Sequence, residues 1–358
     1  MVTEPTLCSE VKSPNPVDMV IGVTQEEPAG YSWPEAARRA RLHFVSGKGG
    51  TGKTTVAAAL ALALAADGKK VLLIECEGRQ GIAQIFDVPP LAPTETKVAT
   101  AEGGGQVSAL AIDIEHALLE YLDMFYNLGF AGRAMRRIGA IDFVTTVAPG
   151  LRDVLLTGKI KETVVRVDKK GKRVYDAVVV DAPPTGRIGN FLDVTKAMAD
   201  LTKTGPLRNQ SDGVVKLLHS PDTVVHLVTL LEAMPIQETI EAVAELESKD
   251  LTIGSLIVNR VSPPHLPLDS IADIADGVID AAELRSQLDA SGLTVTEADF
   301  EGLLTETIEH ASRVQAQLEA GADLDTMHKD KLSIPNFDDG VDLGGLYELS
   351  ELLQKAGA

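Results

Sequence analysis

The chain has 358 residues, of which 44% are hydrophobic and 24% are charged, and its formal net charge is −19. This profile is typical of a soluble protein with one large or two small α/β domains, and the acidic balance disfavours overall binding to nucleic acid or anionic membranes. With only Cys8 and Cys76 present, a disulfide framework and a C-x-x-C zinc clamp within one chain are excluded.

The first 36 residues are acidic and interrupted by prolines, and we expect a disordered tail there. They lack the basic-then-apolar order of a signal peptide. No run of about 18 apolar residues occurs in the chain, so we expect a cytoplasmic protein without direct membrane insertion. Residues 37–358 are expected to form a single domain.

The segment 46–55, Ser-Gly-Lys-Gly-Gly-Thr-Gly-Lys-Thr-Thr, lies between an apolar run at 42–45 and an Ala/Leu-rich run at 56–66. These runs predict a strand and a helix, which is the context of a phosphate-binding P-loop, and the pattern G-x-x-x-x-G-K-[ST] runs from Gly47 to Thr54. Glycines let backbone amides turn toward an anion. The N-terminus of the following helix adds unpaired N–H groups and partial positive charge.

Several side chains of this loop have predicted roles with ATP. Lys53 is expected to bind the β- and γ-phosphates, and the Thr54 hydroxyl is expected to ligate Mg²⁺. Lys48 is a second lysine that an ordinary P-loop does not need, and a solvated surface lysine is the alternative to a functional role for it. The remaining loop residues expected at the nucleotide are Gly47, Gly49, Gly50, Thr51, Gly52 and Thr55.

Carboxylates follow two further predicted strands. The apolar run 71–74 ends at Glu75-Cys76-Glu77, and the β-branched run 175–180 ends at Asp181. Because α/β sheets bind ligands at the carboxyl ends of their strands, Glu75 and Glu77 could serve Mg²⁺ or an attacking water. Asp181 is expected to hold Mg²⁺ through water. The alternatives are solvent-facing loop charges for the glutamates and a plain strand end or helix cap for Asp181.

The rest of the chain predicts an α/β fold, with a mostly parallel sheet flanked by helices. Further strands are expected at 107–112, 223–231, 253–259 and 332–334, with helices at 236–247, within 267–320 and at 343–353. Residues about 115–168 are mainly helical in pattern and lie between strands, which predicts a helical insertion at one edge. Its apolar residues, including Phe125 and Met135, favour core packing over a client-binding surface, although both remain open.

In this order and spacing, the motifs resemble those of the ArsA-like anion-transporting ATPases, the arsenite-pump and tail-anchored-protein-targeting group of P-loop proteins. The loop resembles their deviant Walker A signature, GKGGxGKTT, and residues 181–186 resemble their second switch. Glu77 matches the acid that orients the attacking water. Asn259 matches an adenine-recognising asparagine, and Pro335 lies where the family has a loop beside the base. The chain looks most like the actinobacterial subgroup.

The resemblance implies an ATPase in which Lys48, Lys53, Glu77 and Asp181 are the catalytic residues. It also implies a homodimer, or a heterodimer with a related ATPase subunit across the nucleotide face, with Lys48 reaching the partner's nucleotide. Closure around ATP and Mg²⁺ would engage an unknown client or membrane protein. Glutamate replaces aspartate at Glu77, which predicts slow hydrolysis, and the cysteines that an arsenite site needs are missing.

Two alternatives come from other functional classes. The first is a nucleotide-binding scaffold subunit with little turnover in a heteromeric complex. It fits the change at residues 77–79, where the family has aspartate, proline and alanine in its first switch. A positioning ATPase that shares the loop needs a basic membrane-binding helix or a basic DNA-binding face. The net charge of −19, and a C-terminal helix whose one basic residue is Lys355, argue against this class and against a nucleic-acid partner.

Overall fold

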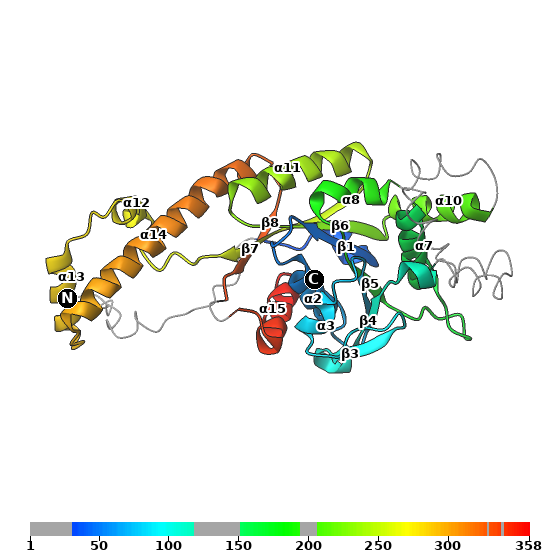
Figure 1. The fold of residues 1–358 in the computed structure, drawn as a ribbon, viewed down its shortest axis with the longest axis horizontal. Helices are drawn as coiled ribbons and strands as arrows, with labels where there is room; N and C mark the ends of the chain where they lie inside the picture. The colour runs from blue at the N-terminus through cyan, green and yellow to red at the C-terminus, as the bar shows by residue number, and fades with distance from the viewer. Residues whose placement is uncertain (1–30, 118–150, 194–205, 328, 338–339) are drawn as a thin grey trace, which may run out of the picture. The chain divides into compact units, whose positions relative to one another are not determined.

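The computed structural model describes residues 31–117, 151–193, 206–327, 329–337 and 340–358 (Figure 1). The strands of these residues are β1 (Leu42–Gly47), β2 (Lys70–Glu75), β3 (Thr96–Thr100), β4 (Gln106–Ala111), β5 (Ala177–Asp181), β6 (Thr223–Thr229), β7 (Ile253–Val261) and β8 (Lys331–Pro335). The α-helices are α1 (Glu35–Arg39), α2 (Lys53–Leu64), α3 (Gly81–Ile85), α7 (Leu151–Val165), α8 (Thr185–Leu192), α10 (Pro206–Leu218), α11 (Ala233–Ser248), α12 (Ile271–Ala275), α13 (Ala281–Ala290), α14 (Glu297–Asp325) and α15 (Leu343–Lys355).

In the described part of the chain, the strands form one 8-stranded sheet with the order β3-β4-β2-β5-β1-β6-β7-β8. All neighbouring pairs are parallel except β3 and β4, which are antiparallel. The predicted mostly parallel α/β fold is therefore confirmed. Strand β3 was not expected, and each predicted strand is found within about two residues of its observed bounds.

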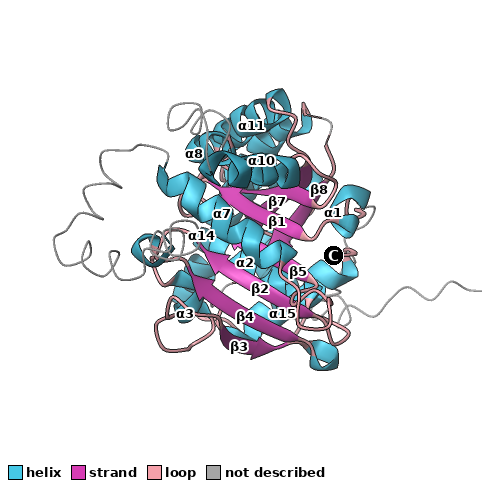
Figure 2. Ribbon diagram, turned by 90° about the vertical axis from the view of Figure 1, so that its right-hand side faces the viewer, coloured by secondary structure: helices cyan, strands magenta, loops and turns pink. Residues whose placement is uncertain are grey.

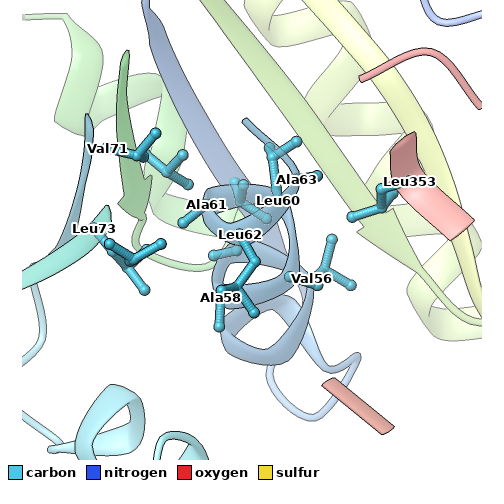
Figure 3. Close-up of a cluster of buried hydrophobic side chains, with 14 of the residues drawn as sticks. Val56, Ala58, Leu60, Ala61, Leu62, Ala63, Val71, Leu73 and Leu353 are labelled. Carbon is cyan, nitrogen blue, oxygen red and sulfur yellow. The ribbon is translucent and has the colours of Figure 1, made fainter. Parts of the chain in front are cut away.

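Helices cover both faces of the sheet, and each face has its own core (Figure 2). Helix α2 is apolar on all sides and is buried between the sheet and α15, which is typical of an interior helix. Figure 3 shows Val56 of α2 beside Leu353 of α15, with Val71 and Leu73 of β2 on the other side of the helix. Residues of α7, α8, α10 and α11 pack on the opposite face.

The described fold begins at Tyr31, six residues before the boundary that composition predicts. Trp33 is only 1% exposed, and its backbone N–H donates to the Ala356 carbonyl over 3.0 Å. The Tyr31 hydroxyl lies 2.6 Å from the Ser255 hydroxyl of β7. Short α1 follows, so residues 31–39 pack against the sheet. Residues 1–30, most of the predicted tail, lie outside the described residues.

The predicted insertion at 115–168 is described only in part. Residues 118–150, including Phe125 and Met135, lie outside the described residues, and residues 151–165 form α7, whose Val154 and Leu156 are buried in the core. Between β7 and β8, helices α12, α13 and α14 extend away from the sheet (Figure 1). Within the described residues, no helix is both long enough and apolar enough to cross a membrane.

Candidate functional site

The site lies where the parallel strands β1, β2 and β5 end. Pairing places Val45 beside Asp181 on one side of β5 and Glu75 beside Asp181 on the other. The segments that follow these three strands therefore start from the same edge of the sheet. This is where the strand-end rule predicts a ligand site.

The P-loop follows β1 and depends on its glycines. Gly50 and Gly52 have φ values of 93° and 86°, which side-chain-bearing residues rarely adopt. A Cβ on Gly47 would lie 2.3 Å from the Val228 carbonyl oxygen, so only glycine fits against β6 there. The loop is closed by Thr51, whose hydroxyl donates to the Lys48 carbonyl over 2.9 Å. The predicted strand–loop–helix arrangement is present.

The N-terminus of α2 is suited to an anion. Its N-cap is Gly52, no side chain caps it, and no acidic residue lies in its first turn. The first turn contains Lys53, Thr54 and Thr55, of which Lys53 is buried and the two threonines are half-buried. Unpaired N–H groups and the helix dipole thus face the loop, as phosphate binding requires. A Cβ at Gly49 would meet no atom within 4 Å, so this side of the loop is open.

Three predicted catalytic side chains converge beside α2. The Lys53 ammonium lies 3.6 Å from Asp181 Oδ1 and 3.8 Å from Glu77 Oε2. The Thr54 hydroxyl donates to Asp181 Oδ2 over 2.7 Å. Lys53, Thr54, Glu77 and Asp181 come from three separate segments, and the fold brings all four together as the motifs predict.

Burial raises the pKa of Asp181, whereas Lys53 and the Thr54 hydrogen bond act in the opposite direction. Asp181 Oδ1 and Glu77 Oε2 are buried and have no hydrogen-bond partner. Both oxygens face the Lys53 ammonium but accept no hydrogen bond, and buried carboxylate oxygens in this condition are common at functional sites. The two oxygens therefore mark the position where a cation or a proton donor would be accommodated.

The Mg²⁺ expected at this position fits the residues present. Mg²⁺ takes oxygen ligands and is usually held by one or two protein groups together with phosphate and water. The Thr54 hydroxyl and the Asp181 carboxylate supply such oxygens, one of which is the unpartnered Oδ1. Among the residues that the structure describes, no group of three or more His, Cys, Asp or Glu side chains could hold a metal ion. The donor set thus fits a metal shared with a phosphate.

The two glutamates after β2 have different environments. Glu75 is 2% exposed and accepts backbone N–H groups from Gln80 over 2.5 Å and Ile82 over 3.2 Å. It therefore fixes the turn into α3 and is occupied structurally. Cys76 lies in the core, and burial raises the pKa of its thiol, which makes it unreactive. Of the three residues, Glu77 alone reaches the Lys53 ammonium.

Glu77 lies among cations that include one from the segment after β2 and one from α8. Arg79 Nη2 lies 3.4 Å from Glu77 Oε2, and Arg187 Nη1 of α8 lies 3.9 Å from Glu77 Oε1. Both guanidinium groups are more than half exposed, whereas the Glu77 side chain is 15% exposed. The carboxylate thus stands where three positive charges meet, which is also where a further anion would be attracted.

The two residues expected at the base lie on neighbouring strand ends. Asn259 of β7 donates through Nδ2 to the Thr51 carbonyl over 2.8 Å, and its Oδ1 accepts the Arg260 N–H over 3.0 Å. Pro335 ends β8 in register with Val261. Asn259 is thereby attached to the P-loop, and Pro335 lies at the same end of the adjacent strand. Their contact with adenine stays a prediction.

Comparison with known proteins agrees with this geometry. The family model of the anion-transporting ATPases matches residues 40–220, a span that includes the P-loop, Glu77 and Asp181. This chain belongs to the anion-transporting ATPase family. It is an ATPase, and the resemblance inferred from its motifs is confirmed.

Relatives of this ATPase are found at two levels of similarity. The ATPase BagA of Mycobacterium tuberculosis is 63% identical over 338 residues, which cover 94% of this chain and 99% of that protein. An arsenical pump-driving ATPase of Aquifex aeolicus is 25% identical, covering 63% and 81% of the two chains. The ATPase GET3 of Kluyveromyces lactis is 26% identical, covering 62% and 72%. The mycobacterial match confirms the similarity to the actinobacterial subgroup.

The ATPase also contains site residues that sequence reasoning missed. Glu238 of α11 lies 2.7 Å from the Lys48 ammonium and accepts a hydrogen bond from the Thr185 hydroxyl over 3.0 Å. Lys48 is therefore paired within its own chain. Glu238 follows no recognisable motif, and 190 residues separate it from Lys48. Helix α11 carries three further glutamates, Glu241, Glu245 and Glu247, so no sequence signal distinguishes Glu238 from them.

Proposed function

We propose that this ATPase is a nucleotide-driven dimeric switch, whose closure around Mg–ATP engages a client or membrane partner. The observation that supports this most directly is the meeting of Lys53, Glu77 and Asp181, with 3.6 Å and 3.8 Å from the ammonium to the two carboxylates. Each carboxylate begins a different segment after its strand. A γ-phosphate bound at Lys53 would act on both segments at once, which is how switch loops are ordered.

In the proposed reaction, the chain's own groups position phosphate and water. Lys53 and the α2 N-terminus bind the phosphates, and Thr54 with Asp181 holds Mg²⁺. When bound, the metal neutralises charge that develops on the phosphate oxygens. Glu77, which follows the β2 strand, orients the attacking water once Lys53 has turned to the phosphate. Asn259 and Pro335 contact the base from the other side of the loop.

We propose that Lys48 contacts the nucleotide of a partner subunit. Its ammonium is paired with Glu238, and a P-loop binds nucleotide within one subunit without a lysine at this position. A lysine at this position would add charge to the partner's triphosphate. The partner is a second copy of this chain or a related ATPase subunit, and the helical insertion is the segment expected to change on closure.

One observation favours a second candidate, a nucleotide-binding scaffold with little turnover in a heteromeric complex. Glu77 is held among Lys53, Arg79 and Arg187, so three cations already compete with a water molecule for its carboxylate. We therefore propose slow hydrolysis. Turnover as fast as that of an efficient ATPase would contradict this point.

Sedimentation velocity on the purified Glu77→Gln chain tests the switch. Glutamine keeps the shape of the side chain but orients water poorly, so the ATP state should persist. We expect a dimer with Mg–ATP and a monomer with Mg–ADP. The control is Lys48→Met in the same background, which should remain a monomer with both nucleotides.

Identical sedimentation with both nucleotides would contradict the homodimer. The heterodimer is tested in the same way with the two subunits co-purified from native extract. If the sedimentation of that complex is also the same with both nucleotides, the switch is contradicted and the scaffold is supported.

A further inference from the structure

The carboxylate of Glu238 joins two segments of the site that are far apart in sequence. Its Oε1 accepts the Lys48 ammonium over 2.7 Å, and its Oε2 accepts the Thr185 hydroxyl over 3.0 Å. Lys48 belongs to the P-loop, and Thr185 is the first residue of α8. Both oxygens are thus engaged, each by a segment that must respond to nucleotide.

The surroundings favour a contact that can be exchanged. Thr185 is 2% exposed, whereas the side chains of Lys48 and Glu238 are 28% and 31% exposed. The Lys48 ammonium holds the pKa of the Glu238 carboxyl below its usual range, so the pair is ionised at neutral pH. A half-exposed ion pair shifts an equilibrium by about fivefold at most, which a bound triphosphate can readily exceed.

The connection from the nucleotide to Glu238 is short. Thr185 lies four residues after Asp181, and the Pro183 carbonyl between them accepts the Ser46 hydroxyl over 2.6 Å. The two prolines at 183 and 184 restrict this turn. A movement of Asp181 would therefore be transmitted to the Thr185 hydroxyl, which is one of the two donors to Glu238.

We propose that Glu238 is a positioning residue that retains Lys48 within its own subunit and releases it when the turn after Asp181 responds to the γ-phosphate. This inference rests on the proposed dimeric switch. While Glu238 Oε1 holds the ammonium at 2.7 Å, Lys48 is turned toward its own subunit and is not extended to a phosphate in another. Because Glu238 retains Lys48 in the nucleotide-free chain, dimerisation depends on ATP.

The first test reads the contact without any dimer. Trace acetylation of the nucleotide-free chain, followed by mass spectrometry, reports the reactivity of each lysine. In Glu238→Gln, we expect Lys48 to react about fivefold faster, because the pairing that protects it is lost. The matched control is Glu241→Gln on the same helix, where Glu241 is exposed and accepts a hydrogen bond from Gln237. Unchanged Lys48 reactivity in Glu238→Gln overturns the proposal.

A second variant, Thr185→Val, keeps the shape at the buried position but removes the donated hydrogen. We expect an intermediate rise in Lys48 reactivity, with a thermal unfolding midpoint that shows the chain is folded. A folded Thr185→Val with reactivity equal to that of the natural chain would overturn the link to the turn after Asp181.

The third test separates this inference from the dimer itself. In the Glu77→Gln background, Glu238→Gln should lower the concentration of chain needed for the Mg–ATP dimer by about fivefold, and Glu241→Gln should leave it unchanged. Weaker dimerisation of Glu238→Gln overturns the proposal, because Glu238 would then support the closed state. If Lys48 reactivity rises but no variant associates with any subunit, the dimeric switch fails while the retention of Lys48 stands.

Discussion

At the scale of single residues, its surroundings make Glu77 the proposed water-orienting acid of this ATPase. It reaches the Lys53 ammonium at 3.8 Å, and its Oε2 is buried with no hydrogen-bond partner. The carboxylate of Glu75, by contrast, accepts hydrogen bonds from two backbone N–H groups and is held in the turn into α3. The sequence places both acids after the same strand, and only the turn into α3 distinguishes their roles.

Substitution of Glu77 has an expected size and direction. Glu77→Gln should slow hydrolysis about a hundredfold or more, with nucleotide affinity changed only a few fold, because a positioned carboxylate contributes about 10²–10⁴ to such reactions. Glu77→Asp should raise turnover if the longer side chain limits the natural chain. Steady-state phosphate release and nucleotide binding measure both effects. Unaltered turnover in Glu77→Gln would show that Glu77 has no role in hydrolysis.

At the scale of elements, the strands β1, β6 and β7 are joined by a buried row of polar groups. The Ser255 N–H donates to His226 Nδ1 over 3.0 Å, so the proton of His226 lies on Nε2, which faces His43 Nδ1 at 3.1 Å. His43 Nε2 then donates to the Ala40 carbonyl over 3.2 Å. Both rings are fully buried and neutral in this arrangement, and an added proton on either would break a hydrogen bond.

This row predicts a loss of stability in acid. Burial lowers the pKa of His43 to about 4 and lowers that of His226 well below its usual value. The unfolded chain takes up these protons near pH 6.5 and the folded chain does not, so the free energy of unfolding falls as pH drops from about 6.5 toward 4. For His43 alone, the loss is about 2 kcal/mol by pH 5.

Urea unfolding at pH 7, 6 and 5 measures this effect, with a His43→Gln/His226→Asn variant as the comparison. The variant should start less stable but lose less stability on acidification. Equal slopes for the two proteins would show that other groups carry the pH dependence.

The packing of α2 gives a second prediction for an element. A Cβ on Gly105 would lie 1.7 Å from the Ala65 carbonyl oxygen, where the end of α2 meets the start of β4. Because backbone must move, Gly105→Ala should lower the free energy of unfolding by about 1–3 kcal/mol. Gly302→Ala in α14 is the control, since its Cβ would meet nothing within 4 Å and should add about 0.5–1 kcal/mol. Thermal melting compares them.

At the scale of the whole molecule, local patterns predicted the frame of the fold and of the site. The strands β1, β2 and β5 were predicted from apolar runs that end in a glycine loop or in an acidic residue. These strands bring Lys53, Glu77 and Asp181 together. Strand β3 was missed because it is a short edge strand in which only two residues, Val98 and Ala99, are apolar. The order of residues 31–36 was missed because nearby prolines outweighed one buried tryptophan, Trp33.

The contacts that regulate the site could not be predicted in this way. Glu238 is an ordinary charged residue of a helix surface, and its partner Lys48 lies on a segment 190 residues away. Arg187 reaches Glu77 because α8 begins beside the segment that follows β2. Such pairs depend on the packing of complete elements, which no short pattern describes.

The proposed switch requires that ATP drives association of this ATPase with a second subunit and a partner. Affinity capture from native lysate with the Glu77→Gln chain, with Mg–ATP in excess and without nucleotide, measures this association. We expect an ATPase subunit and membrane or client proteins to be retained only with ATP, and Lys48→Met in the same background to lose them. A chain that is recovered alone, or with the same proteins in both conditions, would contradict the nucleotide-driven switch.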